Sequence, residues 1–120
     1  MSVVTNVMVS FGHGEPPEVL GRLRGWFDAK GGLGAVTHGF SDPAPYSWGG
    51  NKHPECNLLA GAYNHLDLQS MLEHIQALEW ESPELVQLFV KEEEEATFCV
   101  YMFRDGRLTR VLPYAAWPSA

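Results

Sequence analysis

Residues 66–91 read LDLQSMLEHIQALEWESPELVQLFVK and hold the clearest apolar pattern in the chain. Asp67 is a favourable N-cap residue, and Leu66 before it can pack against Met71 as a hydrophobic staple. Apolar side chains then recur at the three- and four-residue spacing of one helix face. They are Leu68, Met71, Leu72, Ile75 and Leu78. The pattern predicts a helix that begins after Asp67 and ends at 80–83, where a proline interrupts it.

Within the same stretch, the apolar period changes from helical to alternating. Residues 85–91 are predicted to form a strand, with 97–103 as its pairing partner. The Asp105-Gly106 dipeptide is typical of a hairpin turn, which returns the chain along a last strand over 108–112. One face of the first of these strands is formed by Val86, Leu88 and Val90.

The N-terminal third has the same kinds of signal. Residues 3–11 alternate and predict a strand. Residues 15–18, Glu-Pro-Pro-Glu, are typical of a helix start, because proline suits the first turn and acids complement the N-terminal dipole. This helix is expected to end at the glycine pair 31–32. Its apolar stripe consists of Val19, Leu20, Leu23, Trp26 and Phe27.

Two further strands are predicted in the middle of the chain, over 34–40 and 56–65. Between them, residues 41–54 are rich in proline and glycine and carry Tyr46 and Trp48, which indicates a long, ordered loop. The predicted order is β-α-β-β-α-β-β-β. Because βαβ crossovers are right-handed, both helices should lie on one face of a mostly antiparallel sheet. We therefore expect a single α+β domain over 1–120, a ferredoxin-like sandwich with a C-terminal meander.

The predicted strand over 97–103 is apolar on both faces, since its odd-numbered and even-numbered side chains are all apolar except Thr97. Helices cover only one side of such a sheet, so the other side needs a cover. The chain's own aromatic segments, a second subunit or a ligand could supply it. Candidate residues for this second face, or for a pocket on it, are His13, Tyr46, Trp48, Tyr101, Phe103 and Trp117.

The net charge of −7 is concentrated in one part of the chain, because residues 55–95 hold ten acids against Lys91 alone. This surface would repel a phosphate backbone, so nucleic acid is a disfavoured partner and a basic protein is a permitted one. The alternative for 92–95 is a solvated hairpin tip. The predicted partner-binding residues are Glu79, Glu81, Glu84, Glu92, Glu93, Glu94 and Glu95.

Metal binding has a weak signal near the long loop. His53 and Cys56 have a spacing that zinc ligands can use, but a second ligand pair is missing. The residues that could complete such a site are His38, His53, Cys56 and His65. We expect ordinary polar histidines, no cofactor and no catalytic residue. Cys56 and Cys99 are expected to be reduced thiols, and the Gly12-His13-Gly14 turn does not match a dinucleotide or phosphate motif.

The location of the protein follows from what the sequence lacks. No apolar run is long enough to span a bilayer, and the N-terminus has no basic region followed by a cleavage site. We expect a cytoplasmic monomer or homodimer.

Three passages resemble a group of small proteins of unknown function from actinobacteria and their phages. They are the start MSVVTNV at 1–7, the aromatic-Asn-x-Leu-Asp-Leu step at 63–68, and the Trp-x-x-Pro-x-x-Val-Gln-Leu passage at 80–88. The resemblance implies a bacterial or phage setting. It brings no activity, cofactor or catalytic residue.

Two functions of different classes fit these observations. The first is a non-enzymatic module that binds a protein partner through the acidic surface over 55–95, as immunity or counter-defence proteins do. The second is a small-molecule-binding or enzymatic barrel, formed by two copies through the second sheet face, with His13, His38 or His65 near the pocket.

Overall fold

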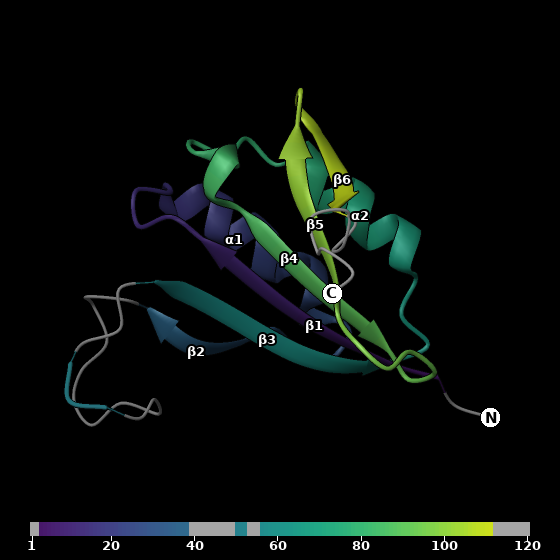
Figure 1. Ribbon diagram of the computed structural model, residues 1–120. Helices are drawn as coiled ribbons and strands as arrows, with labels where there is room; N and C mark the ends of the chain where they lie inside the picture. The colour runs from purple at the N-terminus through teal and green to yellow at the C-terminus, as the bar shows by residue number, and fades with distance from the viewer. Residues whose placement is uncertain (1–2, 39–49, 53–55, 112–120) are drawn as a thin grey trace, which may run out of the picture.

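The computed structural model describes residues 3–38, 50–52 and 56–111 of the chain (Figure 1). Within these residues two α-helices and a six-stranded sheet confirm the α+β class. The elements in chain order are β1 Val4–Phe11, α1 Pro17–Asp28, β2 Gly34–His38, β3 Asn57–Asn64, α2 Leu68–Ala77, the 3-10 helix η2 Pro83–Leu85, β4 Gln87–Glu92, β5 Cys99–Arg104 and β6 Arg107–Val111.

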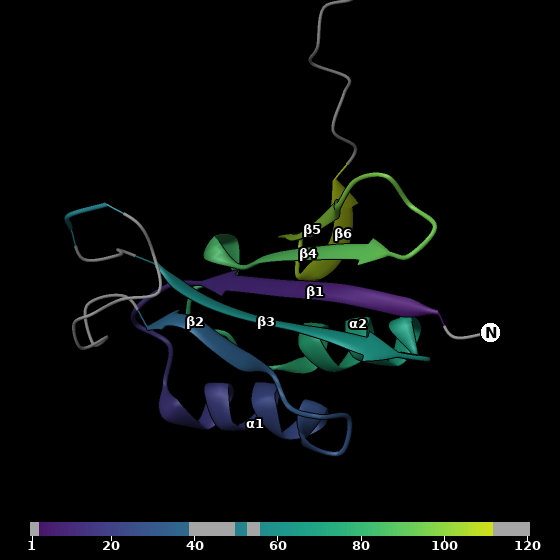
Figure 2. The same ribbon diagram turned by 90° about the horizontal axis from the view of Figure 1, so that it is seen from below.

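The sheet has the strand order β2-β3-β1-β4-β5-β6, and every neighbouring pair is antiparallel. Figures 1 and 2 show α1 and α2 together on one face of the sheet. The alternation of β1 explains this arrangement, because Thr5, Val7, Val9 and Phe11 are buried while their neighbours are half-buried. The helices bury Leu23, Phe27, Met71 and Ile75 against that same face.

Tyr63 on β3 closes one end of this core. Its ring lies over Gly61, where a side chain would collide with it, and its centroid is 5.2 Å from that of Phe27. The hydroxyl donates to the backbone carbonyl of Gly32, with an oxygen–oxygen distance of 2.7 Å. Burial raises the pKa of Tyr63 to about 12. The glycine therefore makes room for an aromatic side chain that ties β3 to the end of the α1–β2 connection.

The two helices begin in different ways. Asp67 caps α2 as predicted: its Oδ1 accepts from the backbone N–H of Ser70 at 3.1 Å, and this bond lowers the pKa of Asp67. The start of α1 lies within the predicted stretch 15–18, since the helix begins at Pro17 with Glu18 in its first turn, while Glu15 lies before it. Glu15 was predicted to complement the helix dipole, but it lies outside the first turn. Its carboxylate instead accepts from the backbone N–H groups of Glu81 and Ser82, at 2.7 and 2.8 Å.

The strand predicted over 85–91 begins later than expected. Leu85 belongs to η2, is 53% exposed and lies against Gly12, so its place in the strand was wrong. The predicted inward face of Val86, Leu88 and Val90 is confirmed, since all three are buried. The chain forms a 3-10 turn over Pro83–Leu85, with Ser82 before it, where the apolar alternation alone suggested an extended strand.

The C-terminal hairpin forms where the Asp105-Gly106 turn was predicted. Both residues have positive φ, 51° and 77°, as a type I′ turn requires. The strand before it begins at Cys99, later than predicted. β6 reaches α2, where the backbone N–H of Leu108 donates to Gln76 Oε1 at 2.9 Å. The predicted loop aromatics Tyr46 and Trp48 and the tail residue Trp117 lie outside the described residues.

Candidate functional site

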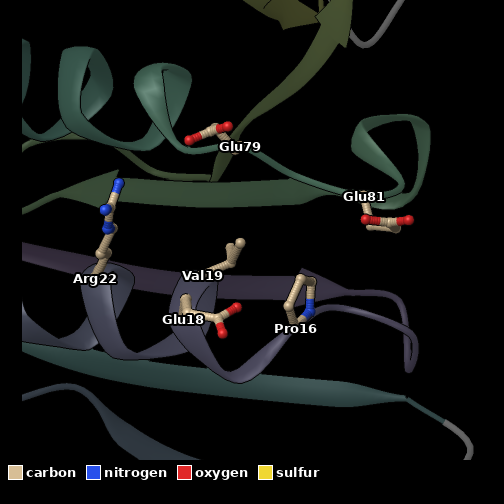
Figure 3. A pocket seen from close by; sticks show the side chains of 6 residues that line it. All are labelled: Pro16, Glu18, Val19, Arg22, Glu79 and Glu81. Atoms are coloured by element: carbon tan, nitrogen blue, oxygen red, sulfur yellow. The ribbon is translucent and has the colours of Figure 1, made fainter.

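A groove with a cavity volume of about 330 Å³ lies between the start of α1 and the segment that connects α2 to η2. Figure 3 shows Glu79 and Glu81 of the connecting segment on one side and the α1 residues on the other. We call it the acidic groove. It is lined by Pro16, Glu18, Val19, Arg22, Glu79 and Glu81.

Trp80 and Glu15 fix the connecting segment that forms one wall of the acidic groove. Trp80 is buried, stacks at a tilt 5.9 Å from Phe11, and donates from Nε1 to the backbone carbonyl of Ile75 at 2.9 Å. The Glu15 carboxylate holds the next two backbone amides. Because Trp80 is buried, its neighbours Glu79 and Glu81 are directed outward and are exposed.

The charges around the acidic groove are unbalanced, with three exposed carboxylates against the single guanidinium of Arg22. Pro16 and Val19 add an apolar part to the same lining. A long cationic side chain matches this arrangement, because its aliphatic stem packs on apolar surface while its head meets carboxylates. Among the lining residues, the carboxylates are the only groups that could act as a nucleophile or a base.

The predicted acidic surface forms two clusters. Glu79, Glu81 and Glu84 precede β4, whereas Glu92 ends it and 93–95 follow it. The length of β4 separates the two clusters by about 20 Å. The second cluster stabilises the turn after β4 and ties it to the start of β1. Glu93 Oε1 accepts from the N–H of Val4 at 3.0 Å, and the N–H of Glu95 donates to the carbonyl of Glu92 at 2.9 Å.

Two charged lining residues of the acidic groove were missed from the sequence as site residues, as were the apolar Pro16 and Val19. Glu18 and Arg22 are four residues apart on α1, so they lie on the same helix face. That spacing was a usable signal, but nothing local showed that this face meets Glu79 and Glu81. The Glu15 contacts that bring them together span more than 60 residues of sequence.

The four predicted metal ligands do not form one site in this chain. Cys56 and His65 lie at opposite ends of the eight-residue β3, which is about 27 Å long. His65 is exposed, has a φ of 57° and donates its backbone N–H to Val3. His38 is paired in register with Asn57, while His53 lies outside the described residues. Among the described residues, no three potential ligands are grouped to hold a metal ion.

Of the residues predicted for the second sheet face, Tyr101 and Phe103 lie in a described strand. Tyr101 is paired with the buried Leu88, and Tyr101 and Phe103 both pack against the core. They therefore lie on the helix-covered face, opposite to the prediction, and Val100 and Met102 lie on the other. His13 is exposed in the turn between β1 and α1.

Cys99 is half-buried and its surroundings oppose thiolate formation. Burial raises its pKa, and Glu95 adds to the effect, with an oxygen 3.7 Å from Sγ. A thiol with a raised pKa is a poor nucleophile near neutral pH.

No protein family, curated protein or solved structure matches this chain. Neither helix in the described part of the chain has the length and apolar character that crossing a bilayer requires. The geometry of the acidic groove is therefore the basis for a functional hypothesis.

Proposed function

We propose that the protein is a non-enzymatic interaction module that binds a basic segment of a protein partner in the acidic groove. One observation carries the proposal: Glu18, Glu79 and Glu81 surround a cavity of about 330 Å³ that also has an apolar wall. A lysine or arginine side chain of the partner would place its stem on Pro16 and Val19 and its charge among the carboxylates. Nucleic acid would be repelled by the same groups.

The fold and the setting complete this proposal. The order β2-β3-β1-β4, with α1 and α2 on one face, supports a ferredoxin-like unit that β5 and β6 extend. The resemblance at 1–7, 63–68 and 80–88 supports a bacterial or phage protein, in which a cytoplasmic regulatory, immunity or counter-defence role suits an acidic binding module.

A fluorescent hexa-arginine peptide provides a defined probe for the acidic groove. We expect Glu79→Gln with Glu81→Gln to weaken peptide binding about five- to tenfold, because each lost exposed ion pair contributes up to about 1 kcal/mol. Fluorescence anisotropy titrations at low salt measure the change, and binding to the unmodified protein should weaken as salt rises.

The matched control is Glu92→Gln with Glu94→Gln, which changes the net charge equally at the other end of β4. This pair should reduce peptide binding much less than the groove pair. Equal losses for both pairs would show non-specific attraction to an acidic protein and would contradict a defined groove.

A further inference from the structure

The sheet face opposite the helices, here called the helix-free face, carries a continuous apolar row. Ala60, Met8, Phe89 and Val100 are paired in register across β3, β1, β4 and β5, and Val111 extends the row to β6. The row thus crosses five neighbouring strands without a charged or polar side chain. Apolar rows of this kind are normally buried.

The rows on either side of the apolar row contain polar and charged side chains. On one side Asn6 is paired with Lys91, and on the other Ser10 is paired with Gln87. The helix-free face therefore has an apolar centre and a polar rim, which is the usual anatomy of a protein interface.

The described residues cover the apolar row only in part. Met8, Phe89 and Val100 are half-buried, whereas Val7 and Leu88 on the same strands are at most 1% exposed on the helix side. Figure 2 shows the two helices on that other side.

One end of the helix-free face has both a hollow and a projecting side chain. The hollow has a volume of about 270 Å³, and Val100, Met102 and Val111 contribute to its lining. Phe98 lines it as well and is 39% exposed. A surface with a hollow beside an exposed aromatic side chain can be complementary to a copy of itself. A twofold axis can place the aromatic side chain of each copy against the hollow of the other.

We infer that a second copy of this chain packs on the helix-free face, sheet against sheet. Six strands at about 4.8 Å spacing and about 20 Å length give roughly 600 Å² per copy and 1,200 Å² in total, which reaches the range of specific interfaces. Two apolar sheet faces pack about 10 Å apart in known sandwiches. The acidic grooves lie on the helix side of each copy and stay accessible.

Sedimentation velocity of the full chain over a micromolar concentration series tests this inference. We expect a species of twice the 13.4 kDa chain mass that persists at high salt, because apolar burial holds it. Phe89→Glu should reduce the mass to one chain and leave the circular dichroism spectrum unchanged. Ala77→Glu, which adds the same charge at an exposed position of α2, should leave the dimer intact.

Three results would overturn the inference: a single-chain mass at every concentration, a dimer that Phe89→Glu does not weaken, or a loss of stability in that variant without any change in mass. The last result would show that the chain covers the face itself. If Phe89→Glu does not fold, Val100→Thr with Met8→Gln serves as the milder variant under the same criteria. The monomeric variant should still bind hexa-arginine, because the acidic groove lies on the helix side. Failure of the dimer inference can therefore be told apart from failure of the acidic-groove proposal.

Discussion

Glu15 joins two segments that lie 66 residues apart in the sequence. Its carboxylate is largely buried and accepts from two backbone amides of the segment before η2, so it sets the distance between α1 and the far wall of the acidic groove. Hydrogen bonds to a charged acceptor are stronger than neutral ones, and their loss leaves buried donors without a partner. A single side chain thus positions the groove without lining it.

We predict that Glu15→Gln lowers the free energy of unfolding by about 2 kcal/mol, because an amide offers one acceptor oxygen in place of two charged ones. Urea denaturation measures the loss. Glu18→Gln is the matched control, since it removes the same charge from an exposed position and should change stability by less than about 0.5 kcal/mol. Equal losses in the two variants would contradict the positioning role of Glu15.

Tyr63 makes the free energy of unfolding depend on pH in the alkaline range. Its pKa is about 12 in the folded protein and 10.0 ordinarily, so the fold favours the neutral hydroxyl. This contribution is complete below pH 10 and is lost as the pH rises through about 12. We predict that Tyr63→Phe costs about 1 kcal/mol near neutral pH, through the lost bond to Gly32, and reduces the loss of stability above pH 10.

Urea midpoints across the alkaline range test the Tyr63 prediction. Part of the alkaline loss should remain in Tyr63→Phe, because burial also raises the pKa of Tyr101. Parallel pH profiles for the two proteins would show that Tyr63 titrates alike in the folded and unfolded states.

Among the elements, the start of α2 was the most predictable and β5 the least. α2 ends at Ala77, before the predicted 80–83. The apolar period and the N-cap of α2 depend only on residues that are close in sequence. Asp67 therefore caps the helix and Met71 and Ile75 are buried, as the sequence predicts. In β5 both faces are apolar, and alternation alone cannot tell which face is inward. The register that pairs Tyr101 with Leu88 decides it, and register is a property of two strands.

Gly61 in β3 and Gly21 in α1 are predicted to respond to alanine in opposite directions. A methyl group at Gly61 collides with the Tyr63 ring, so Gly61→Ala should cost about 1–3 kcal/mol through overpacking. A methyl group at Gly21 meets no atom within 4 Å, so Gly21→Ala should stabilise the helix by roughly 0.5–1 kcal/mol. Thermal unfolding of both variants provides the measurement, and a neutral Gly61→Ala would contradict the close packing of the ring.

For the whole molecule, the sequence shows how many acidic residues there are but not how they are grouped in space. The ten acids of 55–95 suggest one surface, yet the length of β4 separates the seven predicted partner-binding acids into two clusters. The acidic groove exists only because α1 supplies Glu18 and Arg22 from a different part of the chain. Local patterns therefore predicted the order of elements, whereas the site depends on contacts across the fold.

The central position of β1 has a consequence for how the protein folds. Val7 is paired with Gly61 on one side and with Val90 on the other, so every partner of β1 lies more than 45 residues further along the chain. Contacts of such large sequence separation slow folding, because the entropy cost of closing a long loop comes before the free energy that strand pairing gains. The earliest strand thus remains unpaired until the middle of the chain has formed, and an unpaired strand edge is open to non-native pairing in that interval.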